Sequence, residues 1–312
     1  MESDVVHPLA KSNSFSARLG ALASDIKIQH SIFALPWAIL ATVLAARRTK
    51  GGLQWGQILL VLICMVTART VAMTANRLLD AEMDAKNPRT AKRAIPSGKL
   101  SRLFVSVALL GCAALFVAAT SGFWVWYRNP WPLILSVPVL LFLGAYPLLK
   151  KFSRLCHYYL GASLALAPLC AWIAIKGTLD SPPFYMFGAV LLWTAGFDII
   201  YACQDFAFDV EHGLFSVPAK LGIGPALWIA RLTHVGCIAF FVLLGLNTPE
   251  LHTFYWTGVA IAVLLIVIEH SLVKPHDLSK VGFAFFTVNG IISVLIGALG
   301  IVDIFISHSS AN

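Results

Sequence analysis

The sequence predicts an all-α integral membrane protein with nine transmembrane helices. The chain has 312 residues, of which 58% are hydrophobic and only 12% are charged. Soluble proteins carry about 25% charged residues, and the mean hydropathy here is +0.79. Apolar stretches long enough to cross a bilayer, which takes about 20 residues, recur along the chain. Each should be a helix, because lipid offers the backbone no hydrogen-bond partner.

The nine expected spans divide the chain into a single domain with two short ends. Residues 1–30 are polar and lack the features of a cleavable signal peptide, so we expect a cytoplasmic N-terminal segment there. The domain covers residues 31–304, and residues 305–312 form a C-terminal tail. The expected spans are 31–49, 54–79, 102–121, 131–149, 156–175, 183–204, 223–246, 253–273 and 281–304.

The net charge of +8 comes mainly from loops on one side of the bilayer. With nine spans, alternate loops face opposite sides, and the poorer side receives only Arg47, Arg48, Lys50, Arg128 and Lys176. The positive-inside rule then places the N-terminus and the basic loops in the cytoplasm, although the cluster at 47–50 runs against it. We therefore expect a multi-pass protein of a bacterial inner membrane. The distribution of the basic residues indicates a partner in the lipid bilayer and not a nucleic acid. The sequence identifies no protein partner.

Two stretches combine acids with bases: NRLLDAEMDAKNPRTAKRAIPSGKL (76–100) and FDIIYACQDFAFDVEHGLFSVPAKLG (197–222). In the first, Asn76, Asp80 and Asp84 lie four residues apart, so they share one face of a helix. The second repeats the spacing at Tyr201, Asp205 and Asp209, with Asp198 three residues earlier. The two stretches therefore resemble an internal repeat. The alternative is that polar loops after helices simply look alike.

Carboxylates crowded on one face near lipid need a compensating charge. Mg²⁺ suits such sites, because it uses one or two carboxylates, keeps several waters and completes its shell with substrate phosphates. Nearby bases would hold the remaining oxygens of a diphosphate. Two alternatives stay open at this point. The acids can be solvated helix ends, and each base can simply follow the positive-inside rule.

These motifs resemble the UbiA-type intramembrane prenyltransferase superfamily. The likeness extends to KIQHSIFALPWAIL (27–40), YPLLKK (146–151) and YLGASLALAP (159–168), in the expected order. It implies nine transmembrane helices around a central cavity, with a cytoplasmic cap made by both Asp-rich loops. It also implies a polyprenyl diphosphate donor, Mg²⁺ and a small acceptor that is usually aromatic.

The resemblance also implies roles for individual residues. The expected metal-binding residues are Asn76, Asp80, Asp84, Asp205 and Asp209. The expected diphosphate-binding residues are Arg89, Arg93, Lys150, Lys151 and Lys220. One departure concerns the first motif, which often begins Asn-Asp and here reads Asn76-Arg77. This change removes one acid from the metal shell or adds a base that reaches phosphate.

Two residues deeper in the spans are candidate catalytic residues. Asp198 lies about 10 Å deeper than Asp205 by helical rise, and it is the candidate base that takes a proton from the acceptor. Its alternative role is to pair with an Arg or Tyr. Arg69 lies about 10 Å deeper than Asn76, and an ionisable group inside a span indicates function. It would bind the carboxylate of the acceptor or, alternatively, one of the acids.

The implied activity is Mg²⁺-dependent transfer of a polyprenyl group to an aromatic acid of the 4-hydroxybenzoate type, as in ubiquinone biosynthesis. The transfer would proceed by carbocation formation and aromatic substitution. One alternative acceptor is 1,4-dihydroxy-6-naphthoate, as in menaquinone biosynthesis. A different class of function is cation or proton transport, which intramembrane acids can also indicate. Transporters usually bind near the bilayer midplane at broken helices, whereas most acids here lie at helix ends.

Overall fold

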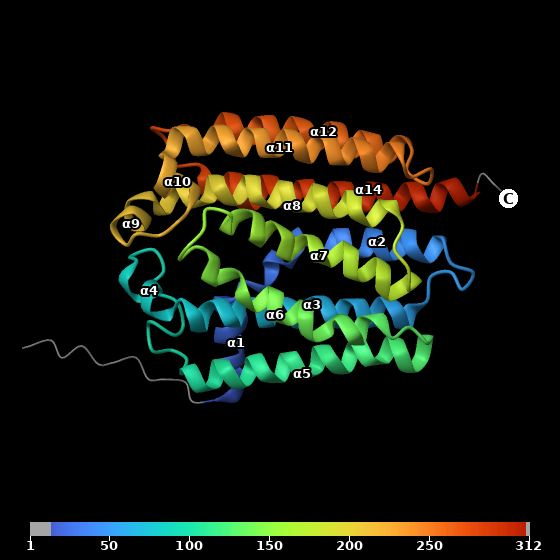
Figure 1. Cartoon of the computed structure of the whole chain (residues 1–312), viewed down its shortest axis with the longest axis horizontal. Helices are drawn as coiled ribbons and strands as arrows, with labels where there is room; N and C mark the ends of the chain where they lie inside the picture. Colours follow the sequence, from blue (N-terminus) through green and yellow to red (C-terminus); the bar gives the residue numbers. More distant parts are fainter. Residues whose placement is uncertain (1–13, 310–312) are drawn as a thin grey trace, which may run out of the picture.

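The structure, a computed structural model, describes residues 14–309. Within this range it contains helices, turns and loops and no strand, which confirms the predicted all-α fold. Residues 1–13 and 310–312, which belong to the expected N-terminal segment and C-terminal tail, lie outside the described part. Figure 1 shows the long helices side by side with their axes roughly aligned.

Eight helical segments among the described residues are long and apolar enough to cross a membrane. Seven of them are built on α3 (Trp55–Leu79), α5 (Arg102–Tyr127), α6 (Trp131–Leu149), α7 (Cys156–Lys176), α8 (Ser181–Ala202), α11 (Ile223–Leu246) and α12 (Thr253–Leu272). The eighth joins α13 (Val281–Phe283), the π-helical turn η3 (Ala284–Val288) and α14 (Asn289–Ser309).

The first expected span, 31–49, is shorter than predicted. It contains α2 (Leu35–Arg47), and the residues before α2 form the 3₁₀ turn η1 (Ile28–Phe33). Pro36 stands in the first turn of α2, where its missing N–H costs no helical hydrogen bond. Leu40 and Leu44 are fully buried, because α7 and α14 pack against α2. This helix therefore lies inside the bundle rather than against lipid.

Two glycines allow α8 to pack closely between its neighbours. A Cβ added at Gly161 of α7 would lie 2.3 Å from the carbonyl oxygen of Leu191 in α8. A Cβ added at Gly196 of α8 would lie 2.3 Å from the ring of His234 in α11. Any larger residue at these positions would push the helices apart. The glycines thus hold α8, which carries Asp198, in a fixed position.

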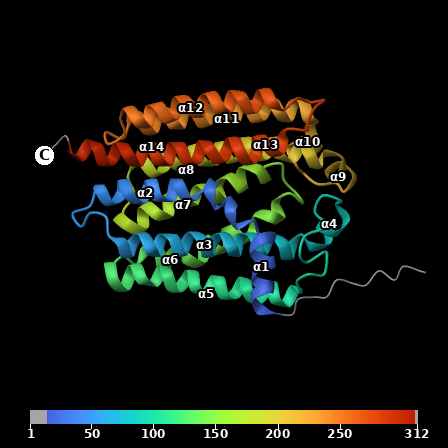
Figure 2. The same ribbon diagram turned by 180° about the vertical axis from the view of Figure 1, so that it is seen from behind.

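Both Asp-rich stretches lie at the same end of the bundle, as the sequence predicts. This end carries α4 (Ala81–Lys86), η2 (Cys203–Asp205), α9 (Phe206–Glu211) and α10 (Val217–Leu221) (Figure 1). Near it, α1 (Phe15–Asp25) runs across α3 and α5 (Figure 2). Leu22 and Ile26 are buried there in one cluster with Leu100. The two loops, with α1 beside them, make the predicted cap.

The opposite end is closed by an ion-pair clasp that sequence analysis did not foresee. Arg48 donates from Nε and Nη2 to the two carboxylate oxygens of Glu250, each at 2.7 Å. Asp180 lies 3.8 Å from Arg48 and also pairs with Lys176. Arg48, which belongs to the basic cluster at 47–50, is thus neutralised within the protein. This pairing helps to explain how a basic cluster can occur on the side that has few basic residues.

The clasp shifts the pKa of both partners. The hydrogen bond that Arg48 donates to Glu250 raises the pKa of Arg48 above its ordinary value. Burial raises the pKa of Glu250, but the hydrogen bond from Arg48, a backbone hydrogen bond and the charges of Arg48 and Arg47 together outweigh burial and leave the pKa below its ordinary value. Both shifts mean that the charged pair is favoured in the folded protein.

We predict that Glu250→Gln destabilises the protein by about 1–3 kcal/mol at neutral pH, the range for a hydrogen bond to a charged group. The pKa of Glu250 is lower in the folded than in the unfolded state, so its contribution is present above pH 4.5. That contribution is lost as the pH falls through the folded-state pKa. Thermal unfolding in detergent, at neutral pH and along an acid series, measures both effects.

The matched control is Glu82→Gln. Glu82 pairs with Arg102 at 3.3 Å, but its side chain is 85% exposed, so solvent screens the pair and its loss should change the melting temperature little. Equal melting temperatures of the wild type and Glu250→Gln would contradict the structural role of the clasp.

Candidate active site

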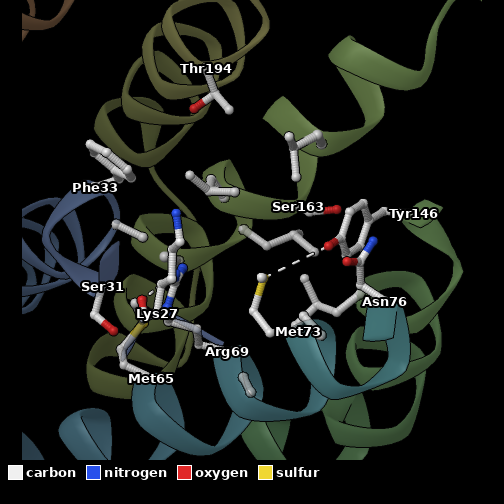
Figure 3. Close-up of a pocket in the computed structure, with 18 of the residues that line it drawn as sticks. Lys27, Ser31, Phe33, Met65, Arg69, Met73, Asn76, Tyr146, Ser163 and Thr194 are labelled. Carbon is white, nitrogen blue, oxygen red and sulfur yellow. Dashed lines mark hydrogen bonds between the residues drawn. The ribbon is translucent and has the colours of Figure 1, made fainter. Parts of the chain in front are cut away.

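The bundle encloses a cavity of about 700 Å³ that opens toward the cap. Residues of α7 line it from Leu160 to Ala174, a distance of about 20 Å by helical rise. Its deep part is largely apolar, with Val61, Phe116, Phe123, Val139 and Leu164 in the wall. Figure 3 shows Lys27 and Arg69 on one side and Asn76 and Tyr146 on the other. The cavity therefore suits an elongated apolar group.

The mouth of the cavity carries a surplus of positive charge. The basic side chains in its lining are Lys27, Arg69, Arg77, Arg89, Lys92, Arg93 and Lys99. The acidic ones are Asp25 and Asp198. A concave site dominated by one sign of charge attracts ligands of the opposite sign. An anionic head on an apolar chain is thus the ligand that this cavity fits best.

The first motif crosses from α3 into α4 at Asp80, whose side chain is buried. Its Oδ2 accepts hydrogen bonds from Lys150 Nζ at 2.6 Å and from Asn76 Nδ2 at 3.1 Å. Its Oδ1 is buried and has no hydrogen-bond partner among the described residues. Asp84 accepts from Arg93 Nη1 at 2.7 Å on both oxygens. The two acids therefore pair with two of the expected diphosphate-binding bases.

The second motif is joined to the loop after the first one. Asp205 accepts from Arg89 Nε at 2.8 Å and Nη2 at 2.6 Å, and from Asn87 Nδ2 at 3.2 Å. Arg89 also donates to the Tyr201 hydroxyl at 3.1 Å. Asp209 accepts from the Ser216 hydroxyl at 2.6 Å. These bonds hold the two Asp-rich loops together across the mouth.

The two motifs also share a backbone shape. The first long helix, α3, ends next to Asp80, whereas α8 ends at Ala202 and reaches Asp205 through the turn η2. The two aspartates have similar backbone angles, φ −98° and ψ 0° for Asp80 and φ −95° and ψ 7° for Asp205. Each aspartate begins a six-residue helix, α4 or α9, that carries the next acid in its first turn. The acids of each motif therefore lie on two successive helices that meet at a bend. At the first bend one helical hydrogen bond is kept, from the Asp80 N–H to the Asn76 carbonyl. The sequence repeat thus corresponds to a repeated local structure.

The two candidate catalytic residues line the cavity itself. Asp198 Oδ2 lies 2.7 Å from His157 Nδ1. Arg69 donates from Nη2 to the backbone carbonyl of Lys27 at 3.3 Å, while its Nε is buried without a partner in the described part of the chain. Neither makes an ion pair with an acid of the two motifs in the described residues. Arg69 therefore keeps hydrogen-bonding capacity for a ligand.

Three of the predicted diphosphate-binding bases, Lys150, Lys151 and Lys220, do not line the cavity. Lys220 is exposed, with its Nζ 4.0 Å from the centre of the Phe215 ring, and Lys151 is exposed as well. The lining includes Arg89 and Arg93, and Lys150 reaches Asp80. Arg77, the departure in the first motif, forms an ion pair with Asp25 at 3.0 Å and donates to Asn76.

Lys27 is a site residue that sequence analysis missed. It follows α1 in a left-handed conformation, with φ 49°, and its side chain lines the cavity (Figure 3). Burial and the positive charges of Arg93, Arg77 and Arg89 lower its pKa. A bound anion would relieve this repulsion. Sequence gave no signal for the role beyond the position of Lys27 before the first span.

Sequence analysis also missed an aromatic wall contributed by the last span. Phe285, in the π-helical turn η3, contacts Phe33, Phe197 and Tyr201 at centroid distances of 5.6, 5.1 and 4.2 Å. All four residues line the cavity. π-helical turns are frequent at functional sites, and aromatic faces attract cations. This wall can therefore stabilise positive charge that develops in the cavity.

The acids of the two motifs fit Mg²⁺ as a shared ligand with a substrate. No group of three or more His, Cys, Asp or Glu within the described ranges is arranged to hold a metal alone. Asp80 does not line the cavity, but its unpartnered Oδ1 is a hard oxygen donor. Mg²⁺ commonly uses one or two carboxylates and takes its other ligands from water and phosphates. The donor set is therefore compatible with Mg²⁺ that arrives with an anionic substrate.

Comparison of the sequence with known proteins identifies related prenyltransferases. The sequence model of the UbiA prenyltransferase family matches residues 34–291. A 4-hydroxybenzoate octaprenyltransferase of Vibrio vulnificus is 27% identical, and the match covers 87% of this chain and 92% of that protein.

Two solved structures are similar in fold. A UbiA homologue from Aeropyrum pernix in its apo form has a TM-score of 0.75 at 26% identity, covering 90% of this chain and 98% of the other. A UbiA homologue from Archaeoglobus fulgidus, bound to DMAPP and Mg²⁺, has a TM-score of 0.67 at 18% identity, covering 91% and 99%.

We predict that Lys27→Met weakens binding of inorganic pyrophosphate about 10- to 100-fold, because one charged hydrogen bond is lost. A bound anion favours the protonated amine, and the pKa of Lys27 in the free protein lies below 10.5. Wild-type affinity should therefore fall as the pH rises through that lowered pKa. The affinity of the variant should not show this fall with rising pH. Equilibrium binding measured across the alkaline range tests both points.

The control for this prediction is Lys86→Met, because Lys86 is exposed on α4 and does not line the cavity. It should bind pyrophosphate with the wild-type affinity and the wild-type pH dependence. The role assigned to Lys27 is wrong if the two variants give the same affinities and the same pH curves.

Proposed function

Since the chain belongs to the UbiA prenyltransferase family, we propose that it transfers a polyprenyl group from polyprenyl diphosphate to an aromatic acid in quinone biosynthesis. One observation carries the proposal: a cavity with a cationic mouth, in which Arg89 and Arg93 bridge to the Asp-rich motifs, leads into a long apolar interior. Such a cavity can hold a donor that has a diphosphate head and a hydrocarbon tail. The name of the Vibrio vulnificus relative supports 4-hydroxybenzoate as the acceptor.

The diphosphate of the donor would lie at the mouth, between the two motifs. Arg89 and Arg93 line the cavity there, and Lys150 contacts Asp80 beside it. Lys27 adds a further base that is repelled by its neighbours in the absence of an anion. On binding, these side chains would exchange their carboxylate partners for phosphate oxygens. Lys151 and Lys220, which are exposed, could contribute only after moving.

The proposed Mg²⁺-binding residues are Asn76, Asp80, Asp84, Asp205 and Asp209. When bound, Mg²⁺ supplies Lewis-acid stabilisation of the negative charge on the departing diphosphate. The Mg²⁺ and DMAPP bound to the Archaeoglobus fulgidus homologue support this assignment through the shared fold. The five residues belong to the two motifs that bend over the same mouth.

Side chains of the protein would then stabilise the charges that form during the reaction. The allylic C–O bond breaks, and its electrons leave with the diphosphate, which Arg89 and Arg93 hold. The remaining allylic cation would lie in the cavity, with the Phe285 wall beside it. A ring carbon of the acceptor forms the new C–C bond. Asp198 accepts the proton that the acceptor must release.

Arg69 is the proposed partner of the acceptor carboxylate. It lies inside the span α3 and lines the same cavity as Asp198, and its Nε has no partner in the described part of the protein. A guanidinium with free donors matches a carboxylate in a bidentate manner. An acceptor held between Arg69 and Asp198 would face the mouth where the donor is ionised.

We propose that the protein lies in a bacterial inner membrane and that the mouth of the cavity faces the cytoplasm. The loops at the mouth carry most of the basic residues outside the helices, which supports this orientation by the positive-inside rule. The clasp at Arg48 supports it too, because the basic cluster at 47–50 is partly neutralised by Glu250 and Asp180.

We predict that membranes containing the protein transfer label from polyprenyl diphosphate to 4-hydroxybenzoate only when Mg²⁺ is present. Asp80→Ala should reduce the rate about 100-fold or more, because it removes a buried group that fixes charge at the mouth. The matched control is Glu82→Ala, whose exposed carboxylate lies two residues away. Separate incubations with 4-hydroxybenzoate and 1,4-dihydroxy-6-naphthoate measure acceptor choice.

The outcomes of this assay separate the candidate functions. Label on the naphthoate alone would assign the protein to menaquinone biosynthesis instead. No label on either acid, with folded protein and a long-chain donor, would contradict prenyl transfer to these acids. Cation or proton flux through proteoliposomes would then be measured, because intramembrane acids also occur in transporters.

We predict that Arg69→Gln raises the KM for the acid acceptor about 10- to 100-fold, since a charged hydrogen bond is lost. The KM for the donor should change little. Methyl 4-hydroxybenzoate is the matched probe, because it lacks the negative charge. The wild type should prefer the acid over the ester, and the variant should lose that preference. A variant that keeps the preference would exclude Arg69 as the carboxylate partner.

A further inference from the structure

His157 is a buried polar residue that the mechanism above does not use. It stands in the first turn of α7 and is only 3% exposed. Its Nδ1 lies 2.7 Å from Oδ2 of Asp198, the proposed base. The side chain of Asp198 is 21% exposed and lines the cavity. The imidazole therefore approaches Asp198 from the protein side, while the carboxylate still reaches the ligand space.

The other ring nitrogen of His157 fixes which atom carries the proton. The backbone N–H of Val217 donates to His157 Nε2 at 3.2 Å. A backbone N–H can only donate, so Nε2 must offer its lone pair. The proton of the neutral ring then lies on Nδ1 and is donated to Asp198. An imidazolium would place two donors against each other at Nε2.

The same loop also contacts the metal-binding motif. Val217 is the first residue of α10, and Ser216 caps that helix by accepting from the Ala219 N–H. The Ser216 hydroxyl donates to Asp209 Oδ2 at 2.6 Å. The start of α10 thus touches Asp209 through Ser216 and Asp198 through His157. A continuous chain of bonds connects an acid at the mouth with an acid in the cavity.

We propose that His157 is a positioning residue for Asp198. This inference rests on the proposed function, in which Asp198 takes the proton released by the acceptor. The Nδ1–H of His157 holds Oδ2 and leaves Oδ1 of Asp198 directed to the acceptor. Through Val217, the start of α10 sets the ring's orientation, so the pose of the base depends on the loop that carries Asp209.

His157 orients the carboxylate and does not carry the proton onward. A relay would need a free acceptor on the ring, and Nε2 is occupied by the Val217 N–H. The proton that reaches Asp198 must therefore leave through the cavity mouth. Loss of the Nδ1–H would free the carboxylate to rotate and would remove a hydrogen bond that stabilises its charged form.

Two substitutions separate the two hydrogen bonds of His157. In His157→Asn, the amide nitrogen lies near the position of Nδ1 and can still donate to Asp198. In His157→Gln, the longer amide reaches the position of Nε2 and can still accept from Val217. His157→Ala removes both bonds. Each purified variant is assayed for kcat, acceptor KM, Mg²⁺-dependent donor binding and melting temperature.

We expect His157→Gln and His157→Ala to lose about 10- to 100-fold in kcat, the effect of one hydrogen bond to a charged group. Donor binding should stay at the wild-type value. His157→Asn should lose less than about fivefold, because donation to Asp198 is restored. A purely structural role predicts instead that kcat follows the melting temperature in all three variants. That result, or equal activity of all three, would overturn the proposal.

A second measurement is independent of activity. In ¹⁵N-histidine NMR of the wild type, the His157 signals are assigned by their absence in His157→Asn. We expect a protonated Nδ1 and an unprotonated Nε2. The opposite tautomer or an imidazolium would overturn the hydrogen-bonded arrangement even if the enzyme is active. A wild type that transfers no prenyl group would overturn the proposed function and, with it, the effect of His157 on kcat. The tautomer measured by NMR would still test the hydrogen bonds that position Asp198.

Discussion

The structure at the mouth depends on the pairing of charges at the boundary of an apolar bundle. Each of three acids, Asp80, Asp84 and Asp205, binds a base from another turn, loop or helix. Removing one partner of a buried pair typically costs about 3–5 kcal/mol, because the remaining charge is uncompensated. The bond between Asp205 and Arg89 joins the two Asp-rich loops, and the bond between Asp80 and Lys150 joins the first loop to α6. The cap is therefore held together by the same groups that would bind the ligand.

Compensation at the mouth is incomplete, and this supports the proposal that a ligand binds there. Two buried atoms have no hydrogen-bond partner in the described structure: one carboxylate oxygen of Asp80 and the Nε of Arg69. The lining has far more bases than acids, and Lys27 is repelled by its neighbours. A diphosphate with its metal would compensate Asp80 and Lys27, whereas the carboxylate of the acceptor would pair with Arg69. Neither partner alone would balance the site.

Sequence predicted those features that depend on local pattern. The apolar spans follow from composition, and both motifs lie at one end of the bundle as the alternation of spans predicts. The bend at each motif was not predicted, because acids four residues apart indicate one face of a continuous helix. It could not predict contacts set by the packing of distant segments. Lys27 reaches the cavity only because the chain turns after α1, and Phe285 only because η3 faces α8. Conversely, Lys220 follows its motif closely in sequence but points away, over the Phe215 ring. Proximity along the chain indicated which loops form the site but not which side chains enter it.

The two ends of the bundle show opposite electrostatic design. At the clasp, Glu250 raises the pKa of Arg48, so the folded state favours the charged pair and that end is closed without a ligand. At the mouth, burial and three arginines lower the pKa of Lys27, so the folded state disfavours its charge until an anion arrives. A positive pKa shift adds to stability, whereas a negative shift for a base represents stability given up. This contrast concerns Lys27 and does not extend to every base at the mouth, because Arg89 there has a raised pKa: its hydrogen bonds and charge pairing with nearby groups, chiefly Asp205, together exceed the effect of burial. Lys27 is therefore a base at the mouth whose charge an anionic ligand would stabilise.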